Sequence, residues 1–122
     1  MSSKVLVFEN RPRLAPELMR QFTGQPVQVM ACRSINDFRN RLNGLTLPVG
    51  VLDVDAAPAA CLQLLSELAG RWPSIPVIAI GSAWSAGLEW ALRELGAVAF
   101  LPDFNSGIGL ARLCQRQWLV GR

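Results

Sequence analysis

Five short apolar runs alternate along the chain with five segments of helical periodicity. The apolar runs span residues 4–8, 27–32, 48–53, 76–80 and 97–101. In the segments that follow them, apolar residues recur every three or four positions, which is the spacing of an amphipathic helix. These segments span residues 16–23, 35–43, 61–72, 84–95 and 108–118. The pattern therefore predicts strands and helices in strict alternation.

Runs this short and this apolar predict strands that are buried on both faces, as in a parallel sheet covered by helices. Strict alternation with short connections predicts a doubly wound α/β fold, (βα)5, with right-handed crossovers. We expect the flavodoxin-like strand order 2-1-3-4-5. The first, third and fourth runs are the most continuously apolar, and the second alternates like a strand near the sheet edge. Without an internal repeat or a linker, residues 1–122 are expected to form one domain.

Residues at the expected helix ends support this division. Ser34 is predicted to cap the second helix, with Asp37 three residues later. Pro73 is expected to end the third helix, and Gly96 follows the fourth at a position that favours a left-handed backbone. Ser106 is expected to cap the fifth helix.

The composition excludes several kinds of chemistry. The chain has no histidine, and its three cysteines, Cys32, Cys61 and Cys114, are isolated among apolar neighbours. Zinc sites need closely spaced ligands, so we expect buried free thiols. Without histidine, the usual general base of serine and cysteine hydrolases is also missing. We therefore expect a protein that is not an enzyme.

Charge and hydropathy exclude two further classes. The net charge is +3, and eleven arginines and one lysine are spread along the whole chain. A nucleic-acid-binding surface concentrates its basic residues on one face, so direct nucleic-acid binding is not expected. No apolar run approaches the roughly 18 residues that a membrane span needs, and no cleavable signal pattern follows Met1. We expect a cytoplasmic protein without a membrane segment.

The third apolar run ends on two carboxylates, Asp53 and Asp55. Residues two apart on a strand point the same way, so both are expected on one face if the pleat continues that far. The carboxyl ends of the strands are where open α/β sheets bind ligands. The candidate functional site is therefore expected at this edge of the sheet.

Several short motifs, in this order and spacing, make the chain resemble the receiver domain of two-component response regulators over nearly its whole length. Residues 5–12 (VLVFENRP) resemble the first strand and its acidic pair, and residues 51–53 (VLD) resemble the third strand with the phosphoacceptor aspartate. Residues 76–80 resemble the fourth strand, while residues 96–97 and 100–101 resemble the Gly-Ala turn and the fifth strand. The resemblance implies the same fold and a role in signalling.

The resemblance also implies roles for individual residues. Asp53 matches the phosphoacceptor, and Glu9 and Asn10 take the places of the acid pair that holds Mg²⁺ with it. A neutral amide in place of a carboxylate removes one charge from the metal shell, so Mg²⁺ binding is expected to be weak or lost. No other cofactor is expected. Phe100 matches the aromatic switch residue, although it also fits a packed aromatic on a buried strand.

The groups that receive the phosphoryl oxygens in that family are missing here. The hydroxyl position falls on Gly81, with Ser82 one residue late. The lysine position falls on Asp103, or on Leu101 if one residue is deleted. Phosphoryl transfer depends on positioned positive charge, so a carboxylate at this place has the wrong sign. The pattern is that of a degenerate receiver, or pseudo-receiver.

Two interpretations of the carboxylates at the strand ends remain open. In the first, they are polar strand ends that loop amides, Arg11 or Arg13 satisfy. In the second, Arg11 or Arg33 places its guanidinium in the vacated metal site and locks the domain in one state.

In receivers the fourth helix, the fifth strand and the last helix commonly form the dimer or partner face. Three of the four tryptophans of this chain lie in those two helices. At helical spacing Trp84 and Trp90 cannot both face the core, so we expect one of them, Trp84, to be exposed. Tryptophan and arginine are enriched at interface hot spots. The candidate patch comprises Trp84, Arg93, Arg112, Arg116 and Trp118.

We therefore expect a receiver-like regulatory module that acts by protein-protein contact, independently of phosphorylation, with a protein partner or as a homodimer. One alternative is a working receiver that accepts phosphate on Asp53, with Ser82 supplying the hydroxyl. A second is a flavodoxin-like domain that binds a small ligand, although the strand ends lack a Gly-rich phosphate loop.

Overall fold

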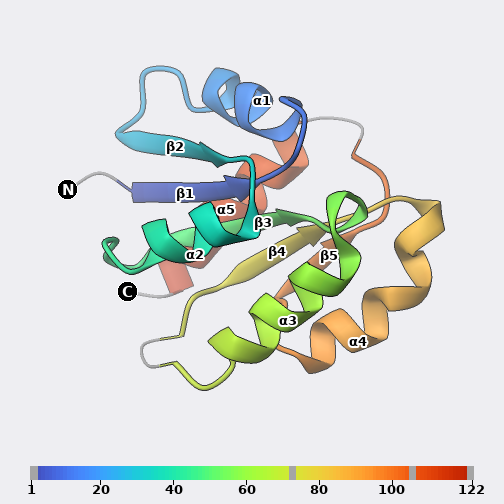
Figure 1. The fold of residues 1–122 in the computed structure, drawn as a ribbon. Coiled ribbons are helices and arrows are strands. Elements are labelled where there is room, and N and C mark those ends of the chain that lie inside the picture. Colours follow the sequence, from blue (N-terminus) through green and yellow to red (C-terminus); the bar gives the residue numbers. More distant parts are fainter. Residues whose placement is uncertain (1–2, 72–73, 105–106, 121–122) are drawn as a thin grey trace.

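The computed structural model describes residues 3–71, 74–104 and 107–120. Its strands form one parallel sheet in the order β2-β1-β3-β4-β5 (Figure 1). The strands are β1 (Ser3–Phe8), β2 (Val27–Cys32), β3 (Val49–Asp53), β4 (Val77–Ile80) and β5 (Ala99–Leu101). The predicted flavodoxin-like (βα)5 fold and its strand order are confirmed, with the alternating second run at a sheet edge.

A helix follows each strand. The helices are α1 (Leu14–Gln21), α2 (Ile35–Leu42), α3 (Pro58–Leu68), α4 (Glu89–Glu94) and α5 (Gly107–Val120), with two 3-10 segments, η1 (Val54–Ala56) and η2 (Ala83–Leu88). Within the described ranges, no helix has both the length and the apolar content to cross a membrane.

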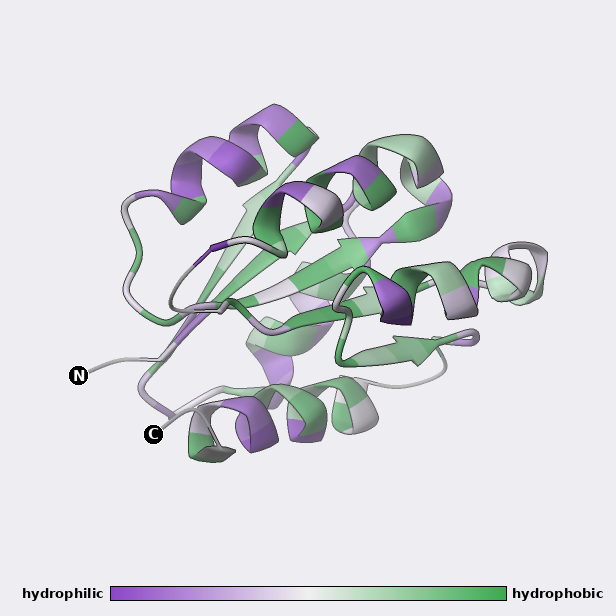
Figure 2. Cartoon of the chain, turned by 90° about the horizontal axis from the view of Figure 1, so that it is seen from below, coloured by the Kyte–Doolittle hydropathy of each residue, from purple (hydrophilic) through white to green (hydrophobic). Residues whose placement is uncertain are grey.

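The sheet lies between two helical layers, each with its own core (Figure 1). Side chains such as Leu6 and Leu52 pack under α2, α3 and α4, whereas Val7 and Val51 pack under α1 and α5. Figure 2 shows apolar residues along the strands and polar residues on the helices. Because both faces of the sheet are buried, the central strands are apolar at nearly every position.

The local signals at the helix ends are borne out where the structure describes them. The Ser34 hydroxyl accepts a hydrogen bond from the Asp37 N–H at 3.0 Å and caps α2. Gly96 follows α4 with φ of 108°, a conformation that glycine adopts without strain. Trp72, Pro73 and Ser106 lie outside the described residues.

The fourth helix differs from the prediction of one continuous helix over residues 84–95. Its first half is the 3-10 segment η2, and only Glu89–Glu94 is α-helical. The Ser82 hydroxyl accepts from the Trp84 N–H (3.2 Å), while the Ser85 hydroxyl accepts from the Ser82 N–H (3.0 Å) and donates to the Ser82 carbonyl (3.3 Å). These bonds tighten the first turn. Since side chains three apart share a face in a 3-10 helix, the segment exposes a different set of residues than an α-helix would.

Candidate functional site

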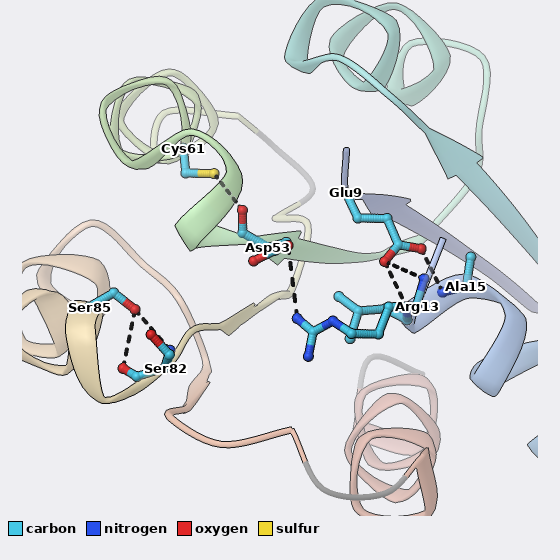
Figure 3. Close-up of polar contacts among 8 residues, drawn as sticks. Glu9, Arg13, Ala15, Asp53, Cys61, Ser82 and Ser85 are labelled. Atoms are coloured by element: carbon cyan, nitrogen blue, oxygen red, sulfur yellow. Dashed lines mark hydrogen bonds and ion pairs between the residues drawn. The ribbon is translucent and has the colours of Figure 1, made fainter. Parts of the chain in front are cut away.

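Two acidic side chains meet at the carboxyl edge of the sheet (Figure 3). Glu9 directly follows β1, Asp53 ends β3, and the two residues are only 1% and 9% exposed. β1 and β3 are adjacent in the sheet but not consecutive in the chain, so this edge is the switch point where open α/β sheets bind ligands. Asp55 does not join them, because the chain turns into η1 after Asp53 and Asp55 is exposed. Asp53 and Asp55 were expected to share one face of the strand only if the pleat continued, and the strand ends at Asp53.

Both carboxylate oxygens of Glu9 are bonded to the start of α1. Oε1 accepts from the N–H groups of Arg13 (3.0 Å) and Leu14 (2.7 Å), and Oε2 accepts from the N–H of Ala15 (2.9 Å). The next residue, Pro16, has no N–H to satisfy. Arg13 holds the N-cap position without a side-chain cap, so Glu9 supplies both the cap and a negative charge at the positive end of the helix dipole. Glu9 therefore stabilises α1.

The Asp53 carboxylate is only partly satisfied. Its Oδ2 lies 3.9 Å from Nη2 of Arg13. Its Oδ1 is buried and has no hydrogen-bond partner among the described residues. Burial raises the pKa of Asp53 above its ordinary value, the Arg13 charge opposes that rise, and the nearby Asp55 adds to it. Asp53 is thus a buried carboxylate with too few hydrogen bonds, and one arginine partly balances its negative charge.

Arg13 connects three parts of the site. Its guanidinium carbon lies 5.3 Å from the ring centroid of Phe104, in the loop between β5 and α5. In Figure 3 the Arg13 side chain reaches from the start of α1 towards Asp53. Of the two interpretations made from the sequence, the structure agrees with the first at Glu9, whose oxygens accept from backbone amides. At Asp53 it agrees only in part, because Arg13 faces one oxygen and the other has no partner among the described residues.

The arginines named for a lock in the metal site do not occupy it. Arg11 is exposed and makes no hydrogen bond or ion pair within the part of the chain that the structure describes. Nη1 of Arg33 donates to the backbone carbonyl of Asn10 at 3.2 Å. The arginine beside Asp53 is Arg13, which the sequence offered only as one of two arginines close to Glu9.

Gly81, at the end of β4, carries no hydroxyl, and Phe100 and the Ser85 hydroxyl fill the space beside it. Gly81 is buried, and a Cβ placed on it would lie 2.9 Å from two ring atoms of Phe100 and even nearer to Oγ of Ser85. The Ser82 hydroxyl, which might have replaced the missing group, caps η2 instead. Phe100 is 5% exposed and packs in the core layer under α2, α3 and α4. The position equivalent to the family's hydroxyl is therefore closed.

The end of β5 carries no cation. Asp103 is exposed just beyond the strand. The other aligned position, Leu101, lies within β5, and its carbonyl accepts from the Gly81 N–H at 2.8 Å. Lys4 lies at the opposite end of the sheet, where its Nζ donates to the Gln28 side chain at 3.0 Å. The positive charge beside Asp53 therefore comes from the start of α1.

This donor set does not fit a magnesium ion. Mg²⁺ needs near-octahedral oxygen ligands, but both Glu9 oxygens are bonded to N–H groups and a guanidinium lies beside Asp53. Asn10 is exposed, and it lines a separate cleft together with Arg33. Across residues 3–71, 74–104 and 107–120, no cluster of three or more acidic, cysteine or histidine residues is placed to hold a metal ion.

The fourth helical segment exposes two tryptophans. Trp84 is 76% exposed, as expected, but Trp90 is also exposed, at 75%. The expectation that the two tryptophans do not both face the core, and that Trp84 is exposed, is confirmed, and the structure exposes Trp90 as well. In the 3-10 segment, Trp84 and Gly87 lie three residues apart, and Trp90 follows at the same interval just inside α4.

The remaining residues of the candidate patch do not all lie on the surface. Arg93 is exposed and pairs with Glu89, with 2.8 Å between Nε and Oε2. Arg112 and Arg116 are exposed and make no ion pair among the described residues. Trp118 does not join them on the surface, because it is half-buried and its ring packs 5.7 Å from that of Phe22.

Known proteins resemble this chain in structure rather than in sequence. No protein-family model matches it, and no curated protein matches it in sequence. Its fold is similar to the receiver domain of the TMAO respiratory system response regulator TorR, with a TM-score of 0.79 and 17% identity over 97% of this chain and 98% of that one.

Two further structures agree with that likeness. Full-length FixJ from B. japonicum matches with a TM-score of 0.82 and 18% identity, over 96% of this chain and 58% of that one. An atypical orphan response regulator, whose structure is described as revealing a new phosphorylation-independent regulatory mechanism, matches with a TM-score of 0.73 and 17% identity over 93% of each chain. The chain therefore has the fold of a response-regulator receiver domain.

Proposed function

We propose that this receiver-fold chain is a non-enzymatic regulatory module that acts by protein-protein contact without being phosphorylated. The proposal rests on the hydrogen bonds that Glu9 accepts from the start of α1. In a phosphorylated receiver an acid at this place would have to offer an oxygen to Mg²⁺, whereas here both oxygens accept hydrogen bonds from the start of α1. Freeing them would leave buried N–H groups without partners, which costs about 1–3 kcal/mol for each group.

The surroundings of Asp53 agree with this proposal. Phosphoryl transfer needs positive charge and hydrogen-bond donors arranged around the transferred group. The chain offers Arg13 at 3.9 Å, but its β4 end is closed by Phe100 and Ser85 and its β5 end has an exposed carboxylate, Asp103. The atypical orphan regulator with a similar fold is consistent with a receiver fold that works without phosphate.

One observation favours the alternative of a working receiver. Oδ1 of Asp53 is buried and has no partner among the described residues, so no hydrogen bond would have to break before this oxygen attacks a phosphoryl group. Incubation with acetyl phosphate and millimolar MgCl₂, followed by intact-mass spectrometry, separates the two functions. We expect no phosphorylated species, while a known receiver treated in parallel gains one phosphoryl group. A phosphorylated product that disappears in Asp53→Asn would show that Asp53 still accepts phosphate.

The surface that we propose for protein contact is the tryptophan face, defined by Trp84, Trp90 and Val98. Trp84 in η2 is 76% exposed, Trp90 in α4 is 75% exposed, and Val98, directly before β5, is 43% exposed. Burying a tryptophan removes a large apolar area from water, and tryptophan is the residue most enriched at interface hot spots. We propose that a second copy of the chain covers this face.

Sedimentation equilibrium tests that contact. The wild-type chain is expected to approach twice its monomer mass of 13.3 kDa as concentration rises, and Trp84→Ala/Trp90→Ala is expected to remain monomeric. Met19→Ala is the matched control, because Met19 is 49% exposed on α1, in the opposite helical layer. A wild-type chain that stays monomeric at millimolar concentration would rule out the homodimer and leave a different protein as the partner.

A further inference from the structure

A cleft of about 540 Å³ opens between α2 and α3, outside the carboxyl ends of β1 and β3. These helices lie next to each other on the same face of the sheet (Figure 1). Phe8 at the end of β1 and Ala57 before α3 both contribute to its lining. The cleft therefore lies at the strand switch point, where ligands bind in open α/β sheets, and its volume is within the range of small-molecule sites. Asp53 does not line it, so it is separate from the carboxylate site.

The charge of the cleft is positive. Arg33 and Arg39 line it, and no carboxylate does. Arg39 is already engaged, because its guanidinium donates to Glu67 at 2.8 and 3.2 Å and to Asn36 at 2.6 Å. Among the residues that the structure describes, Arg33 makes a single hydrogen bond, from Nη1 to the Asn10 carbonyl at 3.2 Å. The other nitrogens of the Arg33 guanidinium remain available to bind an anion in bidentate fashion.

Neutral donors line the cleft together with that guanidinium. The side-chain amides of Asn10 and Gln63 line the cleft and make no hydrogen bond within the described part of the chain. The first turn of α3, which starts at Pro58, has no side-chain cap, so its N–H groups add to the positive potential of the cleft. An anionic group at Arg33 would therefore meet donors from several elements.

Apolar side chains also line the cleft. They are the half-buried Ile35, Ala57 and Ala60 and the buried Phe8. Because the two alanine side chains are single methyl groups, they leave space for a planar ring. The polar and apolar walls together match a ligand with a charged end and an apolar end.

We propose that this cleft binds a phosphorylated organic molecule of about mononucleotide size, with the phosphate at Arg33 and a planar group against Ile35, Ala57 and Ala60. This function is independent of Asp53 and of the tryptophan face. It would give a receiver-fold domain a small-molecule input in place of phosphorylation.

Titration of the full chain with AMP, followed by backbone amide shifts and isothermal calorimetry, tests the proposal, with adenosine as the uncharged probe. We expect saturable AMP shifts at residues 33–36 and 57–60. Since a charged hydrogen-bond pair is lost in each case, adenosine is expected to bind at least about tenfold more weakly than AMP, and Arg33→Ala to weaken AMP binding by a similar factor. Ala60→Phe, which fills the apolar end, is expected to abolish binding.

Arg71→Ala is the matched control, because Arg71 is exposed beyond α3 and makes no ion pair within the described residues. It is expected to bind AMP as the wild type does, and the urea midpoint of each variant verifies its folding. Absence of saturable AMP binding at millimolar concentration would overturn the proposal. So would equal affinities for adenosine and AMP, unchanged binding in Arg33→Ala, or shifts that map to another surface.

Discussion

Replacing Glu9 by Gln tests the role of the buried carboxylate most directly. The substitution keeps the size of the side chain and one acceptor oxygen, which can still serve the N–H groups of Arg13 and Leu14, now bonded to Oε1 at 3.0 and 2.7 Å. The second oxygen becomes an NH₂ group that faces the N–H of Ala15, now 2.9 Å from Oε2. Two donors then face each other at a position where Glu9 is only 1% exposed.

The cost of Glu9→Gln follows from two losses. An unsatisfied buried N–H at Ala15 costs about 1–3 kcal/mol. Removing a negative charge from the start of α1 costs about 0.3–1 kcal/mol, and up to about 2 kcal/mol in a partly buried geometry. We therefore expect the free energy of unfolding to fall by about 2–4 kcal/mol.

Urea unfolding at pH 7 measures this change. With a typical m-value of about 2 kcal/mol/M, the midpoint should fall by about 1–2 M. Glu94→Gln is the matched control, since Glu94 is exposed at the end of α4 and makes no ion pair among the described residues, and it should change stability by less than about 0.5 kcal/mol.

Two results would refute this reasoning. One is a midpoint for Glu9→Gln as close to that of the wild type as the midpoint of Glu94→Gln. The other is stabilisation of the wild type, but not of Glu9→Gln, by millimolar MgCl₂, because that would make Glu9 a metal ligand in spite of its hydrogen bonds to α1.

Three further substitutions probe the same edge of the sheet. Burial raises the pKa of Asp53, so the ionised form of Asp53 disfavours the folded state at neutral pH, and Asp53→Asn should stabilise the chain at pH 7. This gain should shrink as pH falls through the raised pKa, whereas destabilisation at pH 7 in urea unfolding would contradict it. Arg13→Ala should raise the pKa of Asp53 further, which NMR titration of the Asp53 carboxyl carbon measures, and should cost about 1 kcal/mol of stability. An unchanged titration of Asp53 would show that the two charges, 3.9 Å apart, do not interact. Gly81→Ser should lower the free energy of unfolding by about 1–3 kcal/mol, because the added side chain would crowd Phe100 and Ser85, and it should not make the chain accept phosphate from acetyl phosphate. An unchanged melting temperature would mean that the site has room for a hydroxyl on residue 81.

The arrangement of the sheet could be predicted from the order of apolar runs alone. A strand buried on both faces has to be apolar at nearly every position, and strict alternation with short connections leaves few topologies. The runs at 4–8, 48–53 and 76–80 became the three central strands. Short-range signals were equally informative, as at Ser34 and Gly96, because a cap acts within a few residues of its own position.

The chemistry of the site depends on side-chain contacts that cannot be predicted from the spacing of apolar residues in the sequence. The sequence by itself determined that Glu9 and Asp53 end adjacent strands and that no lysine can reach them from the fifth strand. Only the tertiary structure decided that Glu9 turns back to cap α1 and that Arg13, not Arg11 or Arg33, faces Asp53. The physical reason is that several arginines could reach one strand end, and the path of the backbone into α1 selects among them. The same applies to η2, where two serine side chains make hydrogen bonds in the first turn of a 3-10 helix that the sequence pattern had indicated as α-helix.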